Sequence, residues 1–334
     1  MANIKDIAKH AGLSVATVSR VFNNSPLVKP KTRNKVLKVA KELDYQHNIV
    51  AAALRSGKSR IIGVIVPEIN NTFFAAIING IEKKLKFWGY SIIIAQSHDS
   101  AEDQREVLSS FQRLNVDGVL ISAAKEKSDY AQIRKMIDRK IPFVFFDRKP
   151  DDLDQVNSVL LDDHKGAFMA TQHLIDRGCK NLVHVAGEST VPIFTARRNG
   201  FEQAVSQHDA EGVTGKIIEL SEDAAANKML VSQIMTKYPE VDGFFVHGDV
   251  HALYLLDSLK DLNIDVPGQV RVVGFGNADF SDHVTPRLST IDQNCDQMGQ
   301  LAAETLLNQL EVEEVIYTQQ VLLPKLIERA SSAR

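Results

Sequence analysis

The fold of this chain is decided near its N-terminus by Ser14-Val15-Ala16-Thr17-Val18-Ser19-Arg20-Val21-Phe22-Asn23. Ser14 is a good N-cap, because its hydroxyl can accept a hydrogen bond from a free N–H at the start of a helix. Val18, Val21 and Phe22 recur at helical spacing and form one apolar stripe. The other face carries small apolar, hydroxyl, amide and arginine side chains and no acid, which suits a helix in the DNA major groove. The residues expected to contact DNA from this helix are Ser14, Val15, Ala16, Thr17, Ser19, Arg20 and Asn23.

The flanking residues complete a small helical domain. Residues 4–11 form a short amphipathic pattern, and Gly12-Leu13 can make the tight turn before the capped helix. A third helix is predicted from about Pro30 to Leu43, since proline suits a first helical turn. A helix, a glycine turn and a capped polar helix predict a helix-turn-helix. The alternative is an ordinary helical hairpin without a role on DNA.

The charge of the chain is divided unevenly between its two ends. Residues 1–60 hold 12 Lys or Arg and three acids, a net charge of +9, whereas the other 274 residues hold 27 basic and 39 acidic residues, a net charge of −12. A basic N-terminal piece is typical of nucleic-acid binding, and an acidic body is repelled by DNA. DNA binding is therefore expected to be confined to the small domain.

A possible linker follows the third helix. Asn48 is a good N-cap, the alanines after it favour a helix, and Gly57 is a good C-terminal stop. An isolated helix of this length is marginally stable. We therefore expect a segment that becomes helical only with support from a partner or from DNA, the alternative being a plain tether.

From about residue 60 the pattern changes to alternating buried strands and amphipathic helices. Repeated β-α units predict parallel sheets covered by helices on both faces. Two successive series, beginning at about residues 61 and 158, predict an α/β core of two doubly wound lobes. Ligands of such sheets bind beyond the carboxyl ends of the strands, so a cleft between the lobes is the expected binding site.

With these features in order, the whole chain resembles the lactose-repressor and purine-repressor (LacI) family of bacterial transcription regulators. The resemblance rests on Ile4-Lys5-Asp6-Ile7-Ala8, Thr17-Val18-Ser19-Arg20-Val21, Leu43-Asp44-Tyr45, Asp117-Gly118, Arg197-Arg198-Asn199-Gly200-Phe201, Val266-Pro267, Val273-Gly274-Phe275, Ser289-Thr290-Ile291-Asp292-Gln293 and Leu326-Ile327-Glu328-Arg329. It implies a DNA-binding domain at 1–46, a hinge helix at 47–59, and a core at 60–334 like periplasmic sugar-binding proteins. The lobes would span about 60–157 with 293–319, and about 158–292 with 320–334.

The resemblance also implies how the protein acts. It implies a homodimer on a near-palindromic double-stranded DNA operator, with Ala53 and Leu54 of the hinge at the minor groove, where an apolar wedge kinks DNA. A small sugar or sugar derivative bound in the cleft would control operator affinity. The effector contacts carried over position by position are Asn70, Phe73, Phe74, Asp147, Arg148, Arg197, Asp249 and Gln293. For the two phenylalanines and the two aspartates, core packing or strand-end capping is the alternative.

Three positions depart from the family pattern. Gly276 replaces an aspartate, Gly248 replaces an asparagine, and His47 replaces the proline before the hinge. Loss of an acid with retention of Arg148 and Arg197 favours an acidic sugar or a phosphorylated effector. The hinge entry is expected to be more flexible.

Other classes of protein fit less well. The chain has no G-x-S-x-G elbow, no P-loop and no thiol-rich metal pattern, so neither an enzyme nor a cofactor is predicted. His247 and His251 are four apart, but Gly248 stands where a zinc-protease motif needs glutamate. A sugar-binding protein without a role on DNA would lack the basic N-terminal domain. With two cysteines and no export signal or membrane span, we expect a cytoplasmic repressor, dimeric rather than tetrameric.

Overall fold

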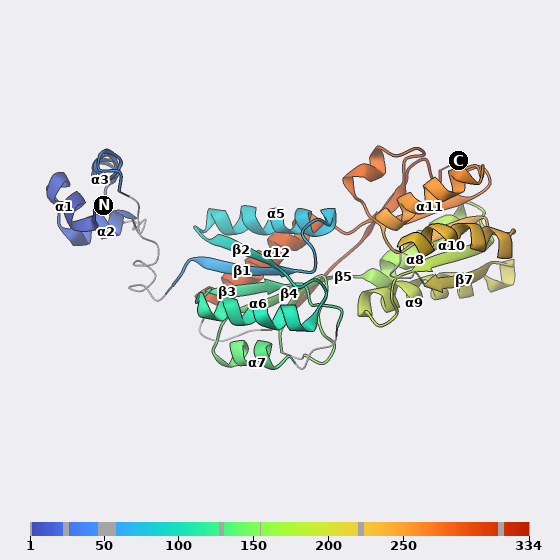
Figure 1. Ribbon diagram of the computed structural model, residues 1–334, viewed down its shortest axis with the longest axis horizontal. Helices are drawn as coiled ribbons and strands as arrows, with labels where there is room; N and C mark the ends of the chain where they lie inside the picture. The colour runs from blue at the N-terminus through green and yellow to red at the C-terminus, as the bar shows by residue number, and fades with distance from the viewer. Residues whose placement is uncertain are drawn as a thin grey trace. The chain divides into compact units, whose positions relative to one another are not determined.

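The computed structural model describes residues 2–22, 27–45, 58–126, 130–153, 155–219, 224–312 and 317–333. The chain divides into two compact units, Met1–Ser59 and Arg60–Arg334, which are described separately (Figure 1). Residues 47–57 of the expected hinge helix, with Ala53 and Leu54, lie outside the described residues, and so does Asn23. Among the described residues, no helix is both long and apolar enough to cross a bilayer.

The described residues of the first unit form three helices, α1 (Ile4–Ala11), α2 (Val15–Phe22) and α3 (Pro30–Glu42). Gly12 ends α1 in the left-handed conformation, with φ of 60°, and so turns the chain toward α2. The Oγ of Ser14 accepts a hydrogen bond from the backbone N–H of Thr17 at 3.1 Å, as expected of an N-cap. One small cluster forms the core of this unit, made of Ile7, Ala8, Ala11, Val18, Val21, Val36 and Ala40.

In the part of the second unit that the structure describes, the strands form two six-stranded sheets. The first has the order β11 (Gln319–Leu322), β5 (Asn157–Leu161), β4 (Phe143–Phe146), β3 (Gly118–Ile121), β1 (Ile61–Val66), β2 (Ser91–Gln96), and all its strands are parallel. The second has the order β12 (Lys325–Ile327), β10 (Ser289–Asp292), β9 (Arg271–Gly276), β8 (Gly243–Val246), β6 (Asn181–Ala186), β7 (Thr214–Glu219). Among the described strands of this sheet, only the β10–β12 pair is antiparallel.

Helices cover both faces of each sheet. The first lobe has α5 (Thr72–Phe87), α6 (Ala101–Arg113), α7 (Ala131–Asp138) and α12 (Cys295–Glu311), and the second has α8 (Asp163–Asp176), α9 (Pro192–Gln207), α10 (Ala224–Lys237) and α11 (Asp249–Asp261). The short 3₁₀ helices are Asp209–Glu211 and Asp279–Asp282. Successive side chains of a strand point to opposite faces of its sheet. In β1, Val64 packs in the apolar cluster beneath α5 and α12, whereas Ile65 packs in the cluster beneath α6 and α7 on the other face. Strands buried on both faces explain the continuous apolar runs in the sequence.

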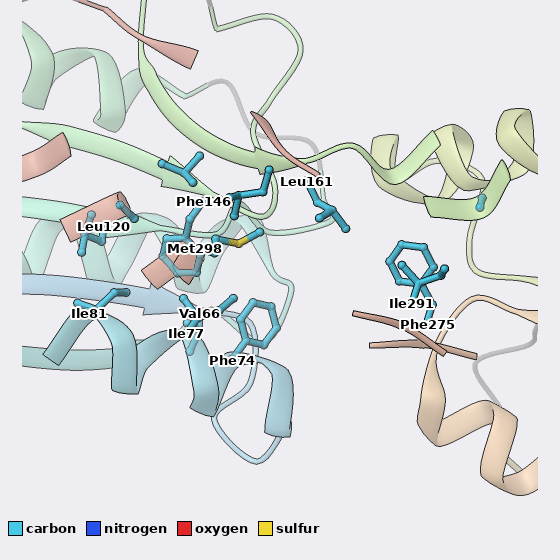
Figure 2. Packing of buried hydrophobic residues seen from close by; sticks show 14 of the residues in the cluster. Val66, Phe74, Ile77, Ile81, Leu120, Phe146, Leu161, Phe275, Ile291 and Met298 are labelled. Carbon is cyan, nitrogen blue, oxygen red and sulfur yellow. The ribbon is translucent and has the colours of Figure 1, made fainter. Parts of the chain in front are cut away.

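The largest apolar cluster reaches into both lobes (Figure 2). In the first lobe it includes Ile77 and Ile81 of α5 and Met298 of α12. In the second lobe it includes Phe275 and Ile291 beside the ends of β9 and β10. The core therefore extends from each sheet toward the region where the lobes join.

Three crossovers join the lobes. The chain passes from β5 to α8, from β10 to α12, and from β11 to β12. The sequence predicted that residues 158–161 open the second lobe and that residues 320–334 belong to it. The pairing of β5 with β4 and β11 corrects the first point and part of the second, because 157–161 and 319–322 lie in the first sheet. Residues 325–327 do lie in the second sheet, where β12 pairs with β10. An apolar run identifies a buried strand but not the sheet that the strand joins.

Several element boundaries also differ from the predicted ones. The sequence pattern predicts helices from Gly166, Arg197 and Ala252, whereas the helices that the structure has there begin earlier, at Asp163, Pro192 and Asp249. Their first turns are polar or contain proline, so apolar periodicity does not reveal them. The strands β10, β11 and β12 and the helix α12 were not delimited from the sequence.

Glycines allow a close approach of two neighbouring helices in each lobe, α5 with α12 in the first and α8 with α9 in the second. A Cβ on Gly299 of α12 would collide with the carbonyl oxygen of Ile77 in α5, and one on Gly80 would collide with that of Asp296. In the second lobe, a Cβ on Gly200 of α9 would collide with the carbonyl oxygen of His164 in α8. The same helix contact thus occurs once in each lobe.

We expect Gly299→Ala to lower the free energy of unfolding. Overpacking against backbone costs about 1–3 kcal/mol, and the better helix propensity of alanine returns up to about 1 kcal/mol, so a net loss of about 1–2 kcal/mol is expected. Urea denaturation of the purified protein measures it. Gln300→Ala, on the exposed side of the same turn, is the control and should change stability by no more than about 0.5 kcal/mol. If the two variants are equally stable, Gly299 does not pack against the backbone of α5 as closely as the structure has it.

Candidate functional site

The exposed face of α2 is the candidate nucleic-acid interface. Val18 and Val21 are buried, whereas Ser14, Val15, Ala16 and Arg20 are exposed and Thr17 and Ser19 are partly exposed. The hydroxyls of Ser14 and Thr17 lie 2.8 Å apart and hold the start of the helix. Arginine and small apolar side chains therefore project from a helix that is anchored by its opposite face, as base readout requires.

Basic side chains of α3 add positive charge to the same small unit. Lys31, Lys35, Lys38 and Lys41 are exposed. Arg33 instead donates a hydrogen bond to the carbonyl oxygen of Val21 at 3.4 Å and so ties α3 to the end of α2. The exposed lysines are suited to phosphate contacts, which position a protein on DNA without reading its sequence.

A cavity of about 550 Å³ lies between the two lobes of the second unit. Its wall is built beyond the carboxyl ends of strands in both sheets, as the α/β architecture predicts. Asp147 and Arg148 follow β4. The segment His247–His251 follows β8, and Gln293 follows β10 at a crossover. The remaining lining residues are Asn71, Thr72, Phe73, Phe74, Ala75, Ala76 and Asn79 from α5 and its N-cap, Ile193, Phe194 and Arg197 from α9, Phe275, Gly276, Asn277, Ala278 and Asp279 after or at the end of β9, and Cys295.

Arg197 has its guanidinium fixed on several sides. It is only 4% exposed, and its Nε donates to Asp163 Oδ1 at 2.7 Å. One terminal nitrogen donates to the carbonyl oxygen of His247 at 2.6 Å, and the other lies 3.5 Å from Gln293 Oε1. The guanidinium carbon stands 3.7 Å from the centroid of the Phe275 ring. Arg197 is thus oriented by protein groups before any ligand enters.

Asp163, which sequence reasoning missed, is the charged partner of Arg197. It lies in the first turn of α8, just after the crossover from β5, and is 6% exposed. Burial raises the pKa of this carboxyl to about 6, although the charge and hydrogen bond of Arg197 favour ionisation. The only signal in the sequence was a pair of acids, Asp162-Asp163, after a buried strand.

The carboxylate of Asp249, predicted to accept hydrogen bonds from an effector, already accepts three from protein groups. Its Oδ1 accepts from the hydroxyl of Thr290 at 2.6 Å, and its Oδ2 accepts from Ser281 at 2.9 Å and from the N–H of Ala278 at 2.8 Å. A carboxylate offers about four acceptor positions. One acceptor position therefore remains for a ligand, and the rest of the group ties the start of α11 to the loop after β9.

Asp147 and Arg148 form the wall in the first lobe. The Ser122 hydroxyl donates to Asp147 Oδ2 at 3.0 Å, and burial raises the pKa of this carboxyl in spite of the neighbouring Arg148. Asp147 has φ of 60°, an uncommon backbone conformation that occurs often at functional positions. Arg148 donates to Asp99 Oδ1 at 2.6 Å and lies 3.6 Å from Asp147 Oδ2.

Two histidines flank the Gly248-Asp249-Val250 segment, in which Gly248 stands where the family pattern has an asparagine. The rings of His247 and His251 are 4.6 Å apart, and the ring of His247 meets that of Phe194 edge to face at 5.0 Å. A Cβ on Gly248 would meet only His251 Nδ1, at 3.8 Å. Burial lowers the pKa of both imidazoles, so neutral rings line this side of the cavity.

The other predicted effector residues are placed as follows. Phe73 and Phe74 line the cavity with their rings in T-shaped contact at 5.0 Å, but Phe74 is also part of the buried core. Gln293 lines the cavity and is 6% exposed. Asn70 is exposed and is not part of the cavity wall, whereas its neighbour Asn71 is, and Asn71 also caps α5.

These ion pairs remove the physical argument for an acidic or phosphorylated effector. Both arginines of the wall have carboxylate partners within 2.7 Å, Asp163 for Arg197 and Asp99 for Arg148. Residue types alone could not reveal these pairings, because the partners lie 34 and 49 positions apart in the chain. The positive charges that pointed to an anionic ligand are therefore already balanced inside the protein.

Comparison with known proteins gives this arrangement a family. Residues 3–48 match bacterial regulatory proteins of the lacI family, and residues 171–332 match a periplasmic binding protein-like domain. Catabolite control protein A of Priestia megaterium is 30% identical over 332 residues, which cover 99% of each chain. This chain belongs to the LacI family. It is a DNA-binding transcription regulator controlled by a small molecule, and not an enzyme.

Solved structures agree with the assignment to the LacI family. A complex of the transcriptional regulator CelR with cellobiose has a TM-score of 0.72 and 25% identity, covering 99% of this chain and 100% of the other. A lac repressor dimer bound to operator has a TM-score of 0.84 at 23% identity, covering 100% and 99%, and so shares the fold. The family and the fold class predicted from the sequence are confirmed.

Proposed function

We propose that this LacI-family protein is a repressor that binds a near-palindromic operator as a homodimer and is controlled by a sugar in the interlobe cavity. The observation that carries the proposal is the combination, in one chain, of the exposed polar face of α2 with a cavity built from both lobes. Repression is the simplest effect of a protein that occupies DNA where polymerase must bind. The site of action would be the cytoplasm, where the DNA is.

A sugar suits the cavity because its wall has both aromatic side chains and polar groups that are held in fixed orientations. Phe73 and Phe194 present aromatic surface to an apolar sugar face. Arg197, Gln293 and the acceptor position left on Asp249 can meet hydroxyls. The cellobiose bound by the related CelR supports this class of ligand.

Movement of the lobes is the proposed means of control. Gln293 lies on one crossover and Asp163 directly follows another, and both contact Arg197. A ligand held by Arg197 would therefore act on the segments that join the lobes. A ligand changes operator affinity only if it binds the two arrangements differently. The hinge residues, including Leu54, would transmit that difference to DNA.

A homodimer is supported by exposed apolar side chains along one edge of the first lobe and on α11. Ile69 and Trp88 are 51% and 46% exposed, and Ile94 on the edge strand β2 is 42% exposed. On α11, Tyr254 is 52% exposed. Exposed apolar residues on an edge strand invite association. Sedimentation that gives only monomer, or a stable tetramer, would contradict the dimer.

The test of the proposed function is a selection of random DNA duplexes by the full-length protein at a stated salt concentration, followed by sequencing. Enrichment of one near-palindromic site is the expected result. The enriched duplex then reports which sugars change its binding. If no duplex is enriched, with or without a metabolite extract as a source of corepressor, the proposal is wrong.

On the selected duplex, Arg20→Ala is expected to weaken binding by about 1–3 kcal/mol, as for the loss of a bidentate base contact. The base preference should relax at one position in each half-site. Lys35→Ala, which removes an exposed charge of α3, is the comparison and should weaken binding to all sequences alike. If Arg20→Ala also weakens all duplexes equally, Arg20 contacts phosphate and does not read a base.

A further inference from the structure

The positive charge of Arg197 is balanced by a group that a ligand does not touch. Asp163 Oδ1 lies 2.7 Å from Nε and 2.7 Å from one terminal nitrogen of Arg197. Arg197 is part of the cavity wall, whereas Asp163 is not. The Asp163 carboxylate therefore contacts Arg197 on the side away from the cavity, and only part of the guanidinium is open to a ligand.

The rest of the wall offers an anion no compensation. Arg148 is paired with Asp99 at 2.6 Å and lies beside Asp147. Asp147, Asp249 and Asp279 all line the cavity. An anionic group entering the cavity would meet carboxylates and two arginines that already have partners, and in a partly desolvated site such repulsion is strong.

We propose that Asp163 determines the charge class of the effector: its pairing with Arg197 admits uncharged polyhydroxyl ligands and excludes anionic sugars. This inference rests on the proposed function, because it concerns the same cavity. Asp163 is a positioning residue, which orients Arg197 toward hydroxyls and cancels its charge. The position of Asp163 in the first turn of α8 favours its ionised form, since helix N-termini stabilise negative charge.

Removal of the carboxylate should convert the cavity into an anion site. In Asp163→Asn the guanidinium of Arg197 keeps its other contacts but loses its charged partner. Such a buried, uncompensated charge attracts an anion. The measurement is the thermal stabilisation of the full-length protein by inorganic phosphate and by glucose 6-phosphate, at constant ionic strength. A pH of 8 is used because the pKa of Asp163 is raised to about 6 and the wild-type carboxyl must be ionised.

We expect Asp163→Asn to respond at phosphate concentrations at least tenfold lower than the wild type. Asp162→Asn is the matched control, since it removes the same charge one position away and keeps a good N-cap for α8. It should behave as the wild type. The double variant Asp163→Asn with Arg197→Gln should lose this increased sensitivity to phosphate, which would show that the anion binds at Arg197. Asp163→Ser provides a second uncharged variant if Asp163→Asn does not fold.

The outcomes separate this inference from the proposed function. An equal phosphate response in the wild type and Asp163→Asn, an equal gain in Asp162→Asn, or a gain that survives Arg197→Gln would overturn the role of Asp163. Release of the selected duplex from the wild type by a uronate or sugar phosphate, and not by its neutral parent sugar, would overturn it too while leaving the proposed function intact. Failure to select any duplex would instead remove the proposed function, and the phosphate result would still stand.

Discussion

The Arg197→Ala variant is expected to keep its affinity for the operator and to lose its response to the effector. Arg197 contacts Asp163 of the second lobe and Gln293 at a crossover, and it lines the cavity. Truncating one partner of a buried, charge-assisted contact costs about 2–5 kcal/mol, which is a loss of about 30-fold or more in effector affinity. The measurement is operator release as a function of sugar concentration, with the sugar found by screening the selected duplex.

Arg198→Ala is the matched control for this prediction. Arg198 is the next residue of α9, but it is 37% exposed and pairs on the surface with Glu219 at 3.2 Å. Its removal takes away the same charge without touching the cavity, so the effector response should be unchanged. If Arg197→Ala responds to sugar as the wild type does, Arg197 is not part of the effector site.

A second large effect is expected at low pH from His184. Its imidazole is buried in the second lobe, stacked on Phe245 at 4.5 Å with an interplanar angle of 9°. Its Nδ1 lies 3.1 Å from the carbonyl oxygen of Phe245, so Nδ1 carries the hydrogen of the neutral ring. Burial lowers the pKa of this imidazole to about 3.

The sign of the pH effect follows from linkage. The unfolded chain protonates this histidine near pH 6.5, whereas the folded protein does not until about pH 3, so stability is lost as the pH falls through this window. From pH 7 to pH 5 the loss is about 2 kcal/mol for one such group. His184→Phe, which keeps a ring in the stack, should lack this part of the acid destabilisation. Urea denaturation at the two pH values measures the difference.

His283→Phe serves as the comparison, because it replaces an exposed imidazole. Its stability should change with pH as that of the wild type does. A wild type and a His184→Phe variant that lose equal stability between pH 7 and pH 5 would show that His184 is protonated in the folded protein.

The sequence was sufficient for the parts of the molecule that depend on local patterns. Ser14, Gly12 and the apolar stripe of α2 specify a capped helix and a turn through short-range contacts, and the structure has them at those positions. The alternation of strands and helices likewise predicted the α/β core. The architecture predicted a cleft beyond the strand ends, whereas Asp147, Asp249 and Gln293 were named from the family resemblance; all three line the cavity.

What could not be predicted depends on pairings between distant residues. The partner of Arg197 lies 34 positions away, and nothing in the residue types distinguishes Asp163 from Asp162. The acidic-effector hypothesis arose for this reason, because an arginine was counted without its counter-ion. The sheet joined by β5 is equally non-local, since its neighbour β11 lies about 160 residues further on.

The interleaved path of the chain also constrains how the protein is made. Ribosomes release residues 60–161 long before they release α12 and β11, which complete the first lobe. Until then the apolar side of α5, with Ile77 and Ile81, has no α12 to cover it. The second lobe can acquire most of its strands during this interval. A nascent chain of this protein therefore exposes an unfinished first lobe through most of its synthesis, and that is the stage at which chaperones would be needed most.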